Sequence, residues 1–310
     1  MMFDGDARKL IEAEGGAAPL AAVATSLRSA DFTVGNLETP LSNRGTVVAG
    51  KPRWLVFEGD PRAVQGLVSA GFDAVSLGNN HMLDHGEIAL SDTLTTLDRA
   101  GIGRAGAGLT ETAAWKPAIV TRNGARVAYL AFTDIVPSGF TPSASNPGVA
   151  IGTDMQRVAA AIRSAKQQAD YVVVSFHWGV EESYTATPQQ VADAHAAVDA
   201  GADMVLGHHP HLLQGVEFYN GKLIAYSLGN FVFPYYKPVG HYSAILRAAL
   251  TPSGTTAASV TPVVLDTAGR PKPATGKDAA AILSRAGVTS RSRATIVTIA
   301  GGKAQLKPYR

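Results

Sequence analysis

The sequence contains no cysteine among its 310 residues, and only 17% of them are charged. Without thiols the chain can form no disulfide, no thiolate metal site and no cysteine nucleophile. No apolar run approaches the roughly 20 residues of a membrane span, and no basic segment followed by an apolar run marks a signal peptide. The net charge is only +2 without a cluster of lysines and arginines, so we expect no nucleic-acid partner.

A hydrophobic content of 46% in a chain of this length is enough to build a substantial core. Segments with helical spacing alternate with short apolar runs that are typical of buried strands, which predicts an α/β fold. Hairpin signals occur at Asn123-Gly124 and Asn220-Gly221. We expect a single domain over residues 1–310, with its motifs between 35 and 233 and with sheet-edge and covering segments at 243–310.

Polar clusters follow the predicted strands at the points where those strands end. In an open α/β sheet the carboxyl ends of the strands line the ligand crevice, so clusters at several ends are expected to converge. Four ends carry residues of the types that bind metals: Asn36 and Glu38, Asn80 and His81, His177, and His209 and His211. This coincidence is the main evidence for a functional site.

Histidine is scarce in this chain, yet three of its eight histidines lie within Gly207–His211. Alternate residues of an extended backbone point the same way, so His209 and His211 are expected to face one site while His208 faces away. A structural turn is the alternative. Three imidazoles in such a short segment after an apolar strand favour metal ligation.

The other candidates each have a simpler structural interpretation. His177, beside Trp178, could be a packed core histidine, but its place at the end of a Val-rich strand favours ligation. The run around Asn80 could be an ordinary turn, although His81 and Asp84 have the spacing of an imidazole oriented by a carboxylate. Glu38 could cap a segment or lie in solvent; as a ligand it would supply the negative charge that a histidine-only site lacks.

Other catalytic motifs fit poorly. The sequence has neither a G-x-S-x-G nucleophile elbow nor a Walker loop. Residues 101–106 match G-x-G-x-x-G, but they follow a predicted helix and do not open one. We interpret this match as coincidental in a chain with 32 glycines.

Taken together, the motifs strongly resemble the CapA family of poly-gamma-glutamate capsule biosynthesis proteins. That family is similar in fold to the calcineurin-like metallophosphoesterases. The motifs occur in the family's order: Gly35-Asn36-Leu37-Glu38, Gly78-Asn79-Asn80-His81 with Asp84 and Gly86, His177-Trp178-Gly179, Gly207–His211 and Ser227-Leu228-Gly229-Asn230-Phe231. The resemblance implies a four-layer α/β/β/α sandwich that carries a divalent metal centre, with Mn, Zn, Fe or Mg as the candidate ions.

The resemblance also implies roles for individual residues. Asn80 and His177 would bind one metal together with His209, and His211 would bind a second. His81, paired with Asp84, would stabilise the phosphate or protonate the leaving group. Asn36 stands where phosphoesterases usually have an aspartate that bridges both metals, so Glu38 would have to supply that charge.

The N-terminus departs from the family pattern. Family members open with an apolar strand followed by Gly-Asp-Val-Met, whose aspartate binds metal, whereas here Met2-Phe3 matches only the end of that motif. We therefore expect a chain that lacks its first strand, an unpaired sheet edge and a weakened second metal position. Asp4 and Asp6 are the alternative carboxylates, although neither follows a strand.

The function that the resemblance implies is metal-dependent, phosphoesterase-like hydrolysis in the synthesis of poly-gamma-glutamate capsule. The alternative is a non-catalytic, metal-stabilised binding or assembly factor for an anionic envelope polymer. Hydrolysis or transfer at the polymer's amide bonds is compatible with the same metals. The implied partners are an anionic polymer or a phosphoester substrate and other membrane proteins of capsule synthesis, at an extracytoplasmic, envelope-associated location.

Overall fold

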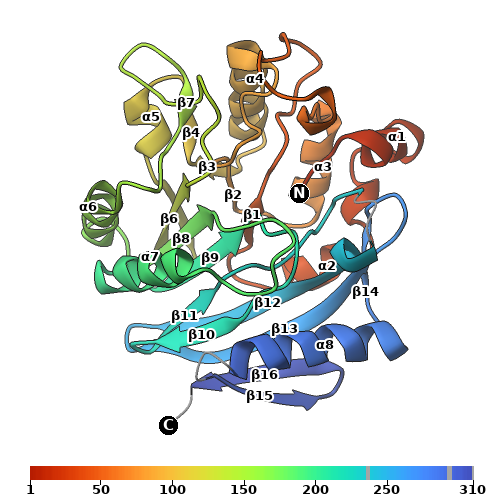
Figure 1. Cartoon of the computed structure of the whole chain (residues 1–310), viewed down its shortest axis with the longest axis vertical. Coiled ribbons are helices and arrows are strands. Elements are labelled where there is room, and N and C mark those ends of the chain that lie inside the picture. The colour runs from red at the N-terminus through yellow and green to blue at the C-terminus, as the bar shows by residue number, and fades with distance from the viewer. Residues whose placement is uncertain (235–237, 292–294, 309–310) are drawn as a thin grey trace.

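The computed structural model of the protein describes residues 1–234, 238–291 and 295–308. Two β-sheets face each other in its upper part, and helices cover the outer face of each (Figure 1). The first sheet is parallel, in the order β1-β2-β3. Its strands are β1 (Val34–Asn36), β2 (Ala74–Ser76) and β3 (Gly103–Ala105).

The second sheet has six strands in the order β10-β11-β9-β8-β6-β5. Its strands are β5 (Ala118–Arg122), β6 (Ala125–Thr133), β8 (Tyr171–His177), β9 (Met204–His208), β10 (Val216–Tyr219) and β11 (Lys222–Ala225). The inner four strands run parallel, and the edge strands β5 and β10 join them through antiparallel hairpins. These hairpins turn at the two Asn-Gly pairs that the sequence predicts.

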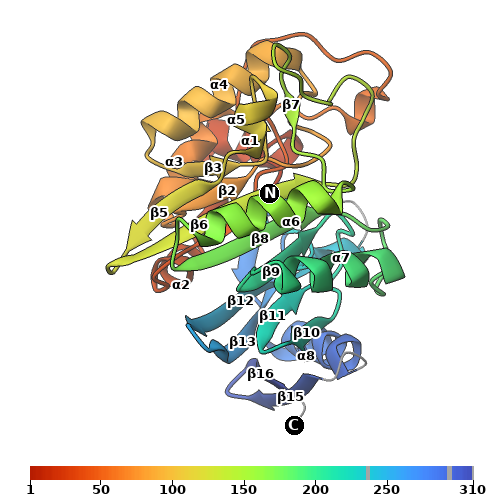
Figure 2. The same cartoon turned by 90° about the vertical axis from the view of Figure 1, so that its left-hand side faces the viewer.

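Side-chain alternation along β8 shows how the layers pack. Val172, Val174 and Phe176 belong to the core beneath the outer helices, whereas Val173 belongs to the core between the two sheets. Such alternation is the period of a strand that is buried on both faces. The outer helices on this side are α6 (Met155–Lys166) and α7 (Pro188–Asp199), which lie across β6, β8 and β9 (Figure 2).

A separate core lies on the outer side of the first sheet. Here α1 (Gly5–Glu14), α3 (Val64–Ser69) and α4 (Gly86–Arg99) bury apolar residues together with Val75 of β2. The result is helices, sheet, sheet and helices, so the predicted four-layer α/β/β/α sandwich is confirmed. The shorter elements are α2 (Ala24–Arg28), α5 (Glu111–Trp115), the pair β4 (Ala107–Gly108) and β7 (Gly148–Val149), and the 3₁₀ turns at Ala18–Leu20, Arg53–Leu55, Pro61–Ala63 and Pro238–His241.

The C-terminal residues build a further antiparallel sheet below the sandwich (Figure 1). Its order is β12-β13-β16-β15, with β14 beside β13, and α8 packs against it and against β10. The elements are β12 (Tyr242–Thr251), β13 (Gly254–Leu265), β14 (Pro271–Pro273), α8 (Gly276–Arg291), β15 (Thr295–Ala300) and β16 (Lys303–Pro308). Among the described residues, no helix has both the length and the apolar character to cross a membrane.

The first residues run alongside the end of β1. The Met1 ammonium donates to the Asn36 carbonyl at 2.6 Å, and the Glu38 amide donates to the Met1 carbonyl at 2.7 Å. Elsewhere along β1, the only strand partner within the described residues is β2.

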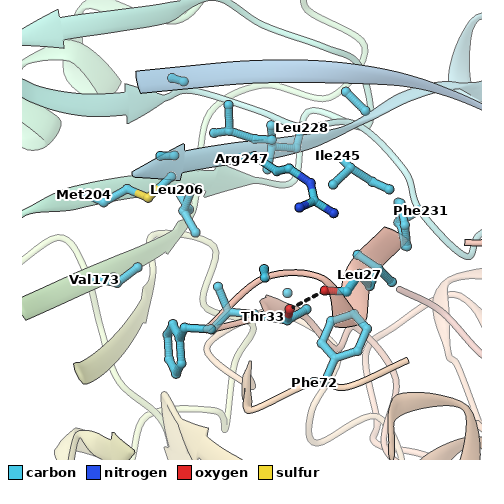
Figure 3. Close-up of a pocket in the computed structure, with 18 of the residues that line it drawn as sticks. Leu27, Thr33, Phe72, Val173, Met204, Leu206, Leu228, Phe231, Ile245 and Arg247 are labelled. Carbon is cyan, nitrogen blue, oxygen red and sulfur yellow. Dashed lines mark hydrogen bonds between the residues drawn. The ribbon is translucent and has the colours of Figure 1, made fainter. Parts of the chain in front are cut away.

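A cavity of about 720 Å³ lies beside this edge, between β1 and β12. Figure 3 shows that its walls are mostly apolar, with Phe72, Met204, Leu206 and Ile245 among the lining residues. The same cavity extends to Glu38, His209 and His211. The metal-ligand candidates therefore lie at the end of a hollow within the sandwich.

Candidate metal centre

The strand ends named from the sequence do converge in the structure. β1 ends at Asn36, β8 at His177 and β9 at His208, and Asn80 lies in the turn after β2. The Asn36 amide donates to Glu38 Oε2 at 3.0 Å, and the His177 and His209 ring centres lie 4.8 Å apart. Parallel strands bring these side chains together because their carboxyl ends share one edge of the sandwich.

Glu38 lies at the middle of the cluster and is only 4% exposed. Its Oε1 is 3.8 Å from His177 Nε2 and 3.8 Å from His211 Nε2. Two ligand atoms that each lie about 2.1 Å from one cation are separated by about 3 to 4.2 Å, so this spacing suits a shared ion. Burial opposes ionisation of Glu38, but the neighbouring positive charges, above all His211, outweigh it and hold its pKa below the usual value.

His209 and His211 converge by a different route from the one expected. The sequence interpretation relied on alternation along a strand, but β9 ends at His208 and both residues lie in the following turn. His209 has φ 96° and His211 has φ 57°, the left-handed region that residues with a β-carbon rarely adopt. The two rings still face one site, with 5.9 Å between their centres. Backbone strain of this kind is typical of functional sites.

His211 is oriented by a residue to which the sequence analysis assigned no role. Its Nδ1–H donates to Asn230 Oδ1 at 2.7 Å, and the Asn230 amide in turn donates to the Gly240 carbonyl. In the neutral ring that metal binding requires, Nε2 of His211 carries the lone pair, and it lies 3.8 Å from Glu38 Oε1. A metal-binding histidine usually donates its other ring N–H in this way. The role of Asn230 in the Gly229-Asn230-Phe231 motif is therefore to orient His211.

His177 is 1% exposed, yet neither of its ring nitrogens has a hydrogen-bond partner in the part of the chain that the structure describes. A packed structural histidine would be expected to satisfy at least one of them. Its neighbour Trp178 has the packing role: it stacks on Phe176 at 4.6 Å between ring centres and donates to the Tyr226 carbonyl. The arrangement therefore favours ligation over the structural interpretation of His177.

Unpartnered buried polar atoms gather at this centre. Leaving such atoms unpaired costs about 1 to 3 kcal/mol each, so each requires an explanation. Within the described residues they are Glu38 Oε1, Asn80 Oδ1, both ring nitrogens of His177, His208 Nε2 and His209 Nδ1. His208 does not face away as expected, because it lies directly opposite His177 where β9 pairs with β8. Carboxylate, amide oxygen and imidazole are the donor types that Mn, Zn, Fe and Mg accept in different proportions. The residues present fit a divalent cation.

The second predicted pair, His81 and Asp84, is buried beside the centre. The His81 Nδ1–H donates to Asp84 Oδ2 at 2.8 Å, and Asp84 is fully buried. The carboxylate fixes the tautomer, so His81 Nε2 carries a lone pair and accepts from the Asn80 amide at 3.2 Å. This geometry is the oriented imidazole that the sequence spacing predicts.

Glu181 is a carboxylate that the sequence analysis did not select. Ligand-type atoms of Glu181, His209 and His211 all lie within 4.8 Å of one another. The residue follows His177-Trp178-Gly179 closely, and that proximity to a chosen motif is the only signal that could have found it. The alternatives Asp4 and Asp6 are engaged locally: Asp4 caps α1 and accepts from the Glu58 amide, and Asp6 pairs with Lys9.

The buried histidines make the metal-free protein sensitive to acid. Burial lowers the pKa of His208 and of His209 to about 4. In the unfolded chain both would take up protons near pH 6.5, so stability is complete above that pH and falls as the pH drops towards 4. Lowering the pH from 7 to 5 should cost the chelator-treated protein about 3 kcal/mol of unfolding free energy. Urea denaturation at the two pH values measures this loss; equal midpoints would contradict it.

Comparisons with known proteins address the family of the chain. The sequence profile of the family described as "Bacterial capsule synthesis protein PGA_cap" matches residues 1–235. "PGA biosynthesis protein CapA" of Bacillus subtilis (strain 168) is 34% identical over 256 residues, covering 82% of this chain and 67% of its own length. "Capsule biosynthesis protein CapA" of Bacillus anthracis is 35% identical over 259 residues, covering 82% and 62%. The chain thus spans about two thirds of the length of these relatives.

One solved structure supports the fold. The 5'-nucleotidase precursor from Thermus thermophilus superposes with a TM-score of 0.50 at 15% sequence identity. The match covers 84% of this chain and 50% of the other. At this identity the likeness concerns the layered sandwich alone.

Proposed function

Since the chain belongs to the bacterial capsule synthesis family PGA_cap, we propose that it is a metal-dependent, phosphoesterase-like hydrolase that serves the synthesis of an anionic envelope polymer such as poly-gamma-glutamate. The observation that carries this proposal is the group of buried, unpartnered ligand atoms beside an oriented imidazole. A buried polar cluster without partners is costly unless a ligand satisfies it. Its proposed location is the cell envelope, beside membrane proteins of capsule synthesis.

In this proposal Asn80, His177 and His209 would hold one cation and His211 would hold a second, and Glu38 would supply negative charge to the centre. Asn36 supports the site by donating to Glu38 Oε2, which leaves Oε1 available. A bound divalent cation would supply charge stabilisation for an oxyanion and would make water a better nucleophile at neutral pH. Glu181 adds a carboxylate next to His209 and His211.

His81 carries the proton transfer in the proposed mechanism. In its protonated form the imidazole donates from Nε2 to the leaving oxygen of the ester, while Asp84 accepts from Nδ1 and stabilises the positive ring. Phe57 stacks on the ring, with 4.1 Å between centres. Because the pair is buried, water does not reach Nδ1, and the imidazole can transfer a proton to the ester only from Nε2.

A second candidate function is supported by Asn36. An amide stands where a bridging carboxylate would be expected, and it is fully engaged: it donates to Glu38 and accepts from the Asn79 amide at 3.1 Å. With one fewer negative charge the centre could serve as a structural cation site in a protein that binds the polymer without cleaving it. Polyglutamate binding that survives His81→Ala would favour this candidate, since a binding role does not need the imidazole.

The direct test is hydrolysis of p-nitrophenyl phosphate and bis-p-nitrophenyl phosphate with added Mn²⁺. We expect turnover that depends on the metal and disappears after chelation. Metal content is measured on the same samples, so that failure of binding and failure of chemistry are distinguished. A folded protein with bound Mn²⁺ and no turnover of either ester would contradict the hydrolase and leave the binding candidate.

A further inference from the structure

The loop between β1 and α3 reaches back onto the turn that carries His81. Two backbone bonds dock it there: the Thr46 amide donates to the His85 carbonyl at 3.1 Å, and the Val48 amide donates to the Asp84 carbonyl at 2.9 Å. The structure shows that two side chains of this loop, Lys51 and Phe57, enclose the His81–Asp84 pair.

Lys51 satisfies the buried carboxylate. Its ammonium forms an ion pair with Asp84 Oδ1 and donates to the Asn80 carbonyl at 2.8 Å. It also lies 3.2 Å from His81 Nδ1; with the proton on Nδ1, both groups direct their N–H bonds at the same carboxylate. The Asp84 side chain is fully buried, and that of Lys51 is 13% exposed. Leaving a buried carboxylate without an opposite charge is costly. Lys51 supplies that charge at Oδ1, while Oδ2 accepts from the imidazole.

Phe57 fixes the plane of the imidazole. Its ring lies against His81 with 20° between planes, and its backbone amide donates to Asp84 Oδ2 at 2.9 Å. On its other side Phe57 meets Phe233 edge-on, and Phe233 contacts the His211 ring at 4.9 Å between centres. One aromatic row therefore connects the imidazole with the metal-ligand candidates.

We propose that Lys51 and Phe57 form a clamp that sets the tautomer of His81 and, through it, the orientation of the Asn80 amide toward the metal. The steps follow from hydrogen-bond polarity. Asp84 accepts a hydrogen bond from Nδ1–H, so in the neutral ring Nε2 is an acceptor and Asn80 must present its NH₂ to it. The Asn80 Oδ1 is then left for another partner. It is buried and has no hydrogen-bond partner among the described residues, as expected of an atom that binds a metal.

This inference rests on the proposed function in that it assumes a cation at the centre, but it concerns positioning residues and not the chemical step. Polar groups that orient a metal ligand are typically worth about 10- to 100-fold in metal affinity. We expect Lys51→Met to raise the Kd for Mn²⁺ about 10-fold. The exposed cation Arg53, two residues along the same loop, provides the control: Arg53→Met should leave the Kd unchanged.

The experiment combines calorimetric titration of Mn²⁺ into the metal-free protein with ¹⁵N NMR of histidine-labelled protein, the His81 signals being assigned through their loss in His81→Asn. Wild type should show the Nδ1–H tautomer of His81 alone, and Lys51→Met should show both tautomers. If Lys51→Met does not fold, as judged by circular dichroism, Lys51→Gln is used, because its neutral amide can still donate to Asp84 while the charge is lost. Both tautomers and a raised Kd are expected in this variant too. Phe57→Leu removes the ring that stacks on His81 and keeps the backbone amide that donates to Asp84.

An unchanged tautomer and an unchanged Kd in the folded Lys51 variant would overturn the proposal. A changed tautomer with an unchanged Kd would overturn the connection to Asn80. Neither measurement needs turnover. Absence of hydrolysis by the wild type would therefore contradict the proposed function while leaving the clamp open to confirmation or rejection on its own terms.

Discussion

Replacing His177 with alanine is expected to lower Mn²⁺-dependent ester hydrolysis about 10³-fold, equivalent to about 4 kcal/mol of transition-state stabilisation. His177 contributes an imidazole with no hydrogen-bond partner among the described residues, 3.8 Å from Glu38 Oε1. Its loss removes a ligand from the cation and leaves the Glu38 charge less compensated. Metal content by mass spectrometry should fall together with the rate.

The matched control is His195→Ala. His195 lies on α7, away from the strand ends, where it stacks on Tyr219 and contacts Glu217 at 3.0 Å. We expect its replacement to cost some stability and to leave both Mn²⁺ content and turnover unchanged. A folded His177→Ala protein that keeps the wild-type metal content would show that His177 is not a ligand, whatever happens to the rate.

Replacing His81 with alanine should separate chemistry from metal binding. We expect kcat to fall about 10²- to 10⁴-fold, the usual contribution of a general acid, with most of the Mn²⁺ content retained. The loss should depend on the leaving group. It should be small for p-nitrophenyl phosphate, because p-nitrophenolate departs without a proton. It should be large for an alkyl phosphate, because its alkoxide must be protonated as it departs. Steady-state rates with both esters give the measurement.

His85 offers a control within the same turn, because it lies close to His81 in the chain and the proposed mechanism gives its ring no role. His85→Ala should retain the wild-type rate with both esters. A His81→Ala protein whose loss is equal for good and poor leaving groups would contradict the acid role and would point instead to a binding role for the imidazole.

The layered fold could be predicted because its strands have clear physical signatures. The Val-rich run before His177 is largely apolar, which indicates a strand buried on both faces, and β8 is such a strand. The Asn-Gly turns predict the two hairpins for an equally local reason, since a left-handed turn favours those residues. Helix α1 was not predicted, because the residues before it gave no recognisable boundary.

The site was partly predictable for a similar reason. Residues at the ends of parallel strands must approach one another, so Glu38, Asn80 and His177 could be grouped before their distances were known. Lys51 and Glu181 could not be grouped in this way, because loops have no periodicity that fixes where a side chain points. The turn through His209 and His211 is the intermediate case: the imidazoles were evident, but the left-handed backbone that aims them was not.

The ligand candidates come from strands that are adjacent in space but far apart in the chain, from Glu38 to His211. Few of them can meet in an unfolded chain, because closing such long loops is entropically costly. The two sheets must dock before the donors surround a cation, which places the centre late in folding. A cation bound only by the finished sandwich stabilises it according to concentration and affinity. The concentration of available metal would then set the fraction of the protein that stays folded, independently of what the centre catalyses.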